Sequence, residues 1–88
     1  MKVIQKATAA GSAETYTFDV FGSVFLVKNM TGSPITVEIL DGVVTIPANT
    51  AQMVMTRMNP TTGDLTNTVK VSALETSELG VEVQCLDY

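Results

Sequence analysis

The sequence predicts an all-β fold, namely a compact antiparallel β-sandwich or small barrel of about six to eight short strands. Three observations support this fold class. Apolar and polar residues alternate over short segments such as 14–21 and 80–85. Gly, Pro and Asn separate these segments at intervals typical of antiparallel sheets. Helical spacing of apolar residues is approached only in 72–79, "SALETSEL".

The chain of 88 residues is expected to form a single β domain, 1–88, with a thin core. Its composition is 45% hydrophobic and only 16% charged, compared with roughly 25% charged in an average soluble domain. Thr, Ser, Asn, Gln and leftover aliphatic residues must therefore cover much of its surface. Because isolated proteins usually carry more surface charge, this composition favours a subunit of an assembly, and we expect a homo-oligomer.

The first strands follow from their alternation. The segment 1–10 contains "KVIQK" and is expected to be an N-terminal arm or an edge strand, joined to the body by "ATAAGSA". Tyr16 and Phe18 alternate with polar residues in 14–21, which predicts one buried face. The segment 23–28, "SVFLVK", is apolar on both faces, as in a central strand that must be covered twice.

A β-hairpin is predicted around Asp41-Gly42, because this pair suits a two-residue turn. The turn would place Leu40 opposite Val43 and Ile39 opposite Val44. Four aliphatic residues then share the core face: Val37, Ile39, Val44 and Ile46. The opposite face carries Glu38, Leu40, Val43 and Thr45. Since an isolated hairpin is at best marginally stable, a second layer must cover its apolar face.

Three more strands are expected in the second half of the chain, at 51–58, 68–73 and 80–88. Methionine fills gaps in cores and also lines adaptable interfaces. Of Met53 and Met55 we therefore expect one in the core and the other at an interface.

The segment 72–79 is predicted to form either a turn of helix or a loop. In the helical alternative, Ser72 and Glu75 make a capping box and Gly80 ends the helix. The short length of the segment leaves the loop equally open.

The chain has no histidine, which removes the commonest general base and the commonest metal ligand. Cys85 lies in the apolar alternation of its segment and is interpreted as a buried core thiol. Glu75 and Glu78 are the only close pair of carboxylates, and their spacing suits a solvated turn better than acid-base chemistry. We therefore predict no catalytic, cofactor-binding or metal-binding residue and no enzymatic activity.

Two further motifs carry little weight. Asn59, Asp64 and Asn67 could offer oxygen atoms to calcium, but their loop lacks the spacing and the bidentate Glu of an EF-hand. Asn29-Met30-Thr31 matches a glycosylation triplet, which we interpret as coincidental because no secretory route is expected.

The start of the chain, "MKVIQKATAAGSAET", does not resemble a signal peptide, because Gln5 and Lys6 interrupt its apolar run. No run approaches the ~20 apolar residues of a membrane span, so no membrane association is expected. The single cysteine fits a protein folded in a reducing cytoplasm. A net charge of -4 with only five basic residues predicts no nucleic-acid binding.

Three stretches carry a resemblance to a known group: "YTFDVFGSVFLVKNMTGSPITVEILDG", "TIPANTAQMV" and "VEVQCLDY". From Tyr16 onward the chain resembles small β proteins encoded among the structural genes of phages and prophages. The shared motifs are loose and none is a catalytic signature. The resemblance implies a virion protein made in the host cytoplasm, either a capsid decoration or a head-associated subunit, present in many copies.

The leading hypothesis is thus a non-enzymatic virion structural protein that binds itself and a major capsid or other virion protein through strand edges and Thr-rich faces. The alternative is a small carbohydrate- or receptor-binding β-sandwich module. Sugar sites usually stack a ring on an exposed aromatic residue; the chain has no Trp, and Tyr88 is the candidate outside the strand patterns.

Overall fold

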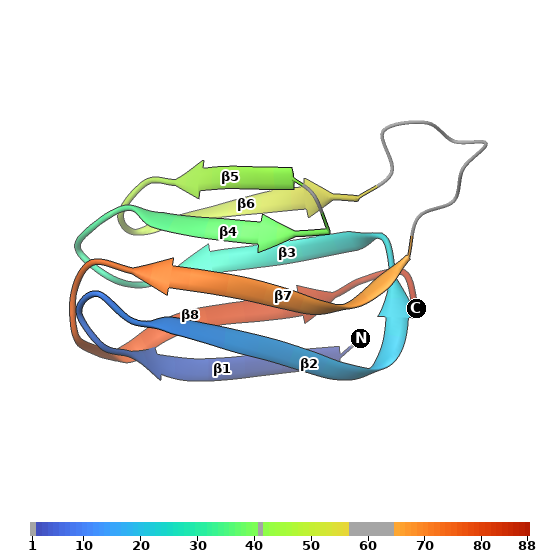
Figure 1. Cartoon of the computed structure of the whole chain (residues 1–88), viewed down its shortest axis with the longest axis horizontal. Coiled ribbons are helices and arrows are strands. Elements are labelled where there is room, and N and C mark those ends of the chain that lie inside the picture. Colours follow the sequence, from blue (N-terminus) through green and yellow to red (C-terminus); the bar gives the residue numbers. More distant parts are fainter. Residues whose placement is uncertain (1, 41, 57–64) are drawn as a thin grey trace.

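Two antiparallel sheets of four strands each form the molecule (Figure 1), so the prediction of an all-β sandwich is confirmed. The computed structural model describes residues 2–40, 42–56 and 65–88. One sheet has the order β1-β8-β3-β6 and the other the order β2-β7-β4-β5. The strands are β1 (Lys2–Thr8), β2 (Ala13–Gly22), β3 (Val24–Asn29), β4 (Ile35–Ile39), β5 (Gly42–Ile46), β6 (Thr50–Met55), β7 (Thr66–Ala73) and β8 (Ser77–Cys85).

The strands pair in a nested order. β4 pairs with β5, β3 with β6, β2 with β7 and β1 with β8, all antiparallel. The chain is therefore one long antiparallel ribbon, folded over at the β4–β5 turn, whose successive pairs alternate between the two sheets. Eight strands in this order are the arrangement of a jelly roll, a double-sheet fold.

Because of this strand order, the connections between the strands lie at two ends of the sandwich (Figure 1). The segments 9–12, 30–34, 47–49 and 74–76 lie together at one end, which we call the Asn29 end. The β2–β3 and β4–β5 connections lie at the opposite end beside both chain termini, and we call this the Asp87 end.

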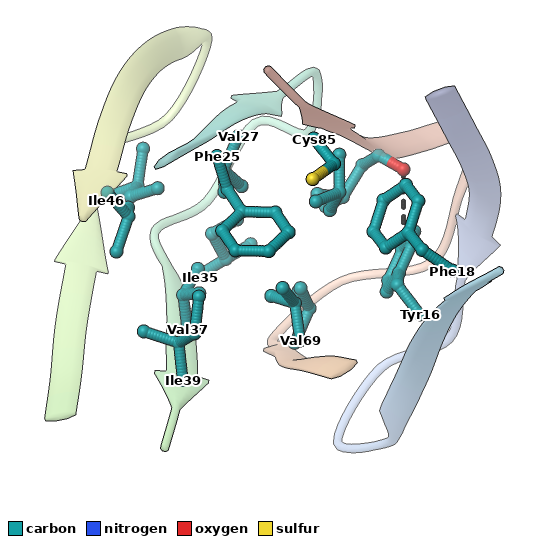
Figure 2. Close-up of a cluster of buried hydrophobic side chains, with 14 of the residues drawn as sticks. Tyr16, Phe18, Phe25, Val27, Ile35, Val37, Ile39, Ile46, Val69 and Cys85 are labelled. Atoms are coloured by element: carbon teal, nitrogen blue, oxygen red, sulfur yellow. Dashed lines mark hydrogen bonds between the residues drawn. The ribbon is translucent and has the colours of Figure 1, made fainter. Parts of the chain in front are cut away.

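The core fills the space between the sheets, with Phe25 near its centre (Figure 2). The rings of Phe18 and Phe25 contact each other with centroids 5.9 Å apart. The Tyr16 hydroxyl donates a 2.9 Å hydrogen bond to the Val81 carbonyl, and burial, followed by the nearby Glu14 carboxylate, raises the pKa of Tyr16 to about 12. Cys85 is fully buried among these residues, as predicted.

The β4–β5 hairpin has the predicted faces but a different register. Val44 lies opposite Val37, whereas the sequence predicted that it would face Ile39. Ile39 pairs with Gly42, and Leu40, which follows β4, adopts a φ of 53°. The observed register sets Ile35 opposite Ile46 and buries both side chains.

A tertiary contact explains this shift of register. β4 also pairs with β7, where Ile35 lies opposite Ala73 inside the core. With the predicted turn, Ile35 would have faced residue 48, beyond Pro47, and lost its buried partner. The local preference of Asp41-Gly42 for a turn was therefore overruled by packing; Asp41 itself lies outside the described residues.

Two predictions for the second half of the chain were wrong. Met53 and Met55 are both exposed, because the side chain of β6 that points into the core is Val54, opposite Phe25. Since alternate residues of a strand share a face, the two methionines could not lie on different sides.

The helical alternative for 72–79 was also wrong: residues 74–76 form a loop, and the rest of the segment belongs to the strands β7 and β8. Ser72 belongs to β7, and β8 starts at Ser77. Glu75 forms no capping box, because its carboxylate accepts hydrogen bonds from Gly32 and Ser33. Gly80 lies within β8, with a φ of 62°.

Candidate interaction surfaces

The outer face of the β1-β8-β3-β6 sheet is largely apolar. Leu26 on β3 lies opposite Met53 on β6, and Val24 lies opposite Met55 in the neighbouring row. Met53 and Met55 are 55% and 60% exposed. We call this surface the apolar face; its aliphatic members are Val3, Val24, Leu26, Met53, Met55 and Leu86.

Polar side chains lie both beside and within this face: Lys28 and Glu82 lie opposite each other in the adjoining row, and Gln84 lies between Val3 and Leu26. Lys28 pairs with Glu82 at 3.3 Å, and Gln84 donates a 2.7 Å hydrogen bond to the same carboxylate. The hydrogen bond from Gln84 contributes most to the lowered pKa of Glu82, and Lys28 adds to it. The charges of Lys28 and Glu82 thus compensate each other, and the apolar face carries no net charge.

The outer face of the β2-β7-β4-β5 sheet has a different chemistry. In one row, Thr36 lies between Ser72 and Thr45. In the next row, Lys70 and Glu38 lie opposite each other, with Nζ and Oε2 4.0 Å apart. We call this surface the threonine face; its hydroxyl residues are Thr15, Thr17, Thr36, Thr45, Thr68 and Ser72.

An open depression of about 390 Å³ lies at the Asn29 end of the apolar side. Its walls come from β3, β6 and the start of β8, and they include Lys28, Met30 and Leu79. Among the residues that the structure describes, no aromatic side chain lines the depression. It therefore offers no ring on which a sugar could stack.

Asn29 holds the connections at its own end of the sandwich. Its Nδ2 donates hydrogen bonds to the carbonyls of Ser33, Ile46 and Pro47, at 2.9, 3.2 and 3.0 Å. Its Oδ1 accepts bonds from the backbone N–H and the hydroxyl of Thr31. The side chain is only 2% exposed, so in the folded chain the glycosylation triplet cannot be modified and serves packing.

Asp87 stabilises the β2–β3 connection at the opposite end of the sandwich, and the sequence analysis did not identify this residue. Its carboxylate accepts hydrogen bonds from the N–H and hydroxyl of Ser23 and from the N–H of Val24. Partial burial raises the pKa of Asp87, but these hydrogen bonds outweigh burial and lower it overall. The contact joins residues more than sixty positions apart, so no local pattern could have indicated it.

The residues weighed as catalytic do not converge. The Glu75 carboxylate binds the Gly32 N–H at 2.9 Å and the Ser33 hydroxyl at 2.9 Å, and these bonds, led by the one from Gly32, lower its pKa. Glu78 lies exposed on β8. Burial raises the pKa of the Cys85 thiol, which keeps it protonated and unreactive.

The calcium hypothesis falls mostly on residues that are not described. Asn59 and Asp64 lie outside the described residues, and Asn67 donates its amide to the Phe18 carbonyl at 3.2 Å. Within 2–40, 42–56 and 65–88, no three His, Cys, Asp or Glu side chains are grouped as metal ligands. Over the same residues there is no helix long and apolar enough to cross a membrane.

Comparison with protein-family models, with curated proteins and with solved structures gave no match for this chain. The two outer faces, the strand edges and the exposed aromatic residues at the Asp87 end are therefore the features on which a function can be argued.

Proposed function

We propose that the chain is a non-enzymatic structural subunit of a phage virion, a capsid decoration or head-associated protein that binds its own copies and a shell protein. The observation that carries this proposal is the apolar face. Exposed apolar patches on small proteins commonly mark protein-binding sites. A partner that bound this face would cover the outer side of β3, the strand that the sequence predicts to be apolar on both faces.

The size of the apolar face suits a weak contact that is repeated many times. Covering its six side chains would remove on the order of 400 Å² of apolar surface from water, worth roughly 10 kcal/mol before the costs of association. Those costs consume much of this gain, so one copy alone would bind a shell weakly. Self-association supplies avidity, because linked copies bind the shell together.

The fold and the sequence resemblance both support a virion role. Jelly rolls recur in viral capsid proteins, although they also occur in lectins and cupins. The resemblance to structural proteins of phages covers most of the chain from Tyr16 onward, which includes the strands β3 and β6 of the apolar face.

The test is binding to particles from the phage or prophage that encodes the chain. Density-gradient-purified particles are probed with an antibody against the chain, and particles lacking it are then incubated with recombinant protein. Wild-type protein is expected to bind saturably in many copies, and Leu26→Lys on the apolar face is expected to abolish binding. Thr36→Lys, on the matching central strand β4 of the threonine face, is the control. Particles without the chain and without saturable uptake would refute the virion role.

A carbohydrate-binding module is the second candidate function. The Asp87 end carries two exposed aromatic residues, Phe21 at 59% and Tyr88 at 51% exposure, and rings of this kind stack on sugars. A glycan array with wild-type protein and Phe21→Ala tests this candidate. Signals that the Phe21 variant loses would favour the sugar-binding function over the virion function.

A further inference from the structure

The strand β6 lies at an edge of its sheet with one set of backbone groups pointing outward. The Thr56 N–H donates to the Ser23 carbonyl at 2.8 Å, which extends the regular β3–β6 register. Because antiparallel pairs alternate in their bonding, Thr50, Gln52 and Val54 direct their backbone groups toward β3. Ala51, Met53 and Met55 consequently direct theirs away from it. Among the described residues, no strand pairs with this outer side of β6.

The opposite side of the sandwich, made by β1 and β2, is protected against such pairing. Lys2 and Lys6 lie on the inward side of β1 and reach across to β2. Lys2 binds Asp19 at 3.3 Å, and Lys6 donates a 2.8 Å hydrogen bond to the Thr15 carbonyl. The pairings of these strands, β1 with β8 and β2 with β7, also contain a register break each. Inward charges and register breaks are the usual means by which edge strands avoid other chains.

The remaining edge, β5, is protected by a proline. Ile39 pairs with Gly42 across the two-residue turn, so the outward backbone positions of β5 are Val43 and Thr45, followed by Pro47. Proline has no N–H to donate, and it commonly blocks edges. β6 has no charged residue, no proline and no break in register, which distinguishes it from β1 and β2; β5 shares these features and differs from β6 in the proline that directly follows it.

We propose that two copies of the chain associate by antiparallel pairing of β6 with β6 around a two-fold axis at Met53. The pairing specifies the self-association on which the proposed function relies. It joins the two four-stranded sheets into one continuous sheet and brings the two apolar faces together as a single surface. A dimer of this kind would present twice the apolar area to a shell protein.

The register follows from the outward positions. With Met53 opposite its own copy, Ala51 lies opposite Met55, and all three outward residues pair within the strand. An axis at Gln52 or Val54 would leave one outward residue of β6 without a partner in the other β6. The chosen register also places a small side chain beside a large one and lets the two Met53 side chains pack together.

Sedimentation velocity over a range of concentrations tests the proposal. Wild-type protein is expected to reach twice the 9.4 kDa of the chain. Met53→Lys places two like charges opposite each other and is expected to weaken dimerisation by at least about tenfold. Val43→Lys is the matched control, because Val43 is a similarly exposed apolar residue on the edge strand β5, and it is expected to leave the dimer unchanged.

Met53→Pro tests the backbone pairing itself. The Met53 N–H points away from β3, so proline removes only an outward donor, and the monomer is expected to stay folded by circular dichroism. The dimer is expected to be lost. A wild-type monomer at every concentration would overturn the edge pairing, as would a Met53→Lys dimer of wild-type affinity. If Met53→Pro does not fold, the sedimentation of Met53→Lys still decides whether the β6 edges pair.

The particle-binding experiment separates this inference from the proposed function. If the edge pairing is wrong but the function is right, wild-type protein still saturates particles and Leu26→Lys still fails to bind. If the function is wrong but the pairing is right, the Met53 variants lose the dimer while no protein binds particles.

Discussion

At the Asn29 end, the four connections are tied to one another in sequence, whereas at the Asp87 end a single carboxylate holds one corner. The segment 9–12 bonds to 74–76 through the N–H of Ala10, and 74–76 bonds to 30–34 through Glu75. The segment 30–34 in turn bonds to 47–49, because the Asn49 N–H donates to the Thr31 carbonyl at 3.1 Å. The buried Asn29 side chain also bonds to two of these segments, through the carbonyls of Ser33 and Pro47.

The two ends differ in burial, in charge and in their backbone conformations. Asn29 is neutral and buried, so its contribution to stability does not depend on pH, while the contribution of Asp87 requires an ionised carboxylate. The Asn29 end places Gly11 and Asn49 where φ is positive, but the Asp87 end places Leu40 there. The difference indicates that the Asn29 end is the rigid base of the sandwich and the Asp87 end is more tolerant of change.

The largest effect is expected from Asn29→Ala. The change removes the Asn29 donor from three buried or part-buried carbonyls and the acceptor of the Thr31 N–H, while the Ser33 carbonyl keeps its bond from the Thr31 hydroxyl, and it should cost about 3 kcal/mol of unfolding free energy. Asn67→Ala is the control, because Asn67 donates to only one carbonyl, and it should cost about 1 kcal/mol. Urea denaturation of both variants measures the difference, and equal losses would contradict the central role of Asn29.

A smaller loss is expected from Gly80→Ala within the rigid end. A Cβ at Gly80, which has a φ of 62°, would collide with the Lys6 carbonyl of β1. We expect a cost of about 2 kcal/mol, the sum of backbone strain and displacement of β1. Gly11→Ala has a similar φ of 73° but no atom within 4 Å, so it should show only the strain, about 1 kcal/mol. Thermal melts compare the pair, and identical losses would argue against the contact with β1.

Asp87→Asn tests the charged end and its dependence on pH. The folded pKa of Asp87 lies below its usual value of 3.8, so the carboxylate stabilises the fold fully above that value. This stability is lost as the pH falls through the lower, folded pKa. At pH 7 the variant should lose about 0.5–1 kcal/mol, a value reduced by solvent exposure.

The difference between Asp87→Asn and wild type should shrink as the pH falls below 3.8 in urea titrations. Asp19→Asn removes the same charge from an exposed ion pair with Lys2 and should change the stability less. A difference that stays constant down to low pH would show that the hydrogen bonds of Asp87 do not require its charge.

The smallest effect, and the only gain, is expected from Leu40→Asn. Leucine is strained at a φ of 53°, and asparagine tolerates this region, so the variant should gain about 0.5 kcal/mol. The converse change, Asn49→Leu at a φ of 54°, should lose a similar amount at the rigid end. Chemical denaturation resolves the opposite signs, and a loss for Leu40→Asn would mean that its exposed side chain makes a stabilising contact.

Much of the fold was predictable because strand faces are local properties. Alternation placed Tyr16 and Phe18 in the core, and Val37 and Ile39 were correctly assigned to one buried face. Cys85 was correctly interpreted as a buried thiol for the same reason. The choice between Met53 and Met55 failed although both lie on one strand, because it disregarded this same alternation.

The candidate surfaces were harder to predict from the sequence than the strand faces. The apolar face combines residues from β1, β3, β6 and the end of the chain, and no segment of the sequence contains them all. Asn29 was visible only as part of a glycosylation triplet, because its carbonyl partners on 46 and 47 are remote in sequence. The unprotected edge of β6 could be recognised only once its neighbours were known.

The sequence alone determined that this protein is built of short strands, most of them with one buried face, because side chains of a strand alternate with a period of two residues whatever their surroundings. The tertiary structure decided which strands are neighbours, which register β4 and β5 adopt and which edge stays open. Those choices depend on the closure of long loops and on burial of isoleucines from different strands, such as Ile35 against Ile46. A local sequence pattern contains no information about loop closure or about which isoleucines pack together.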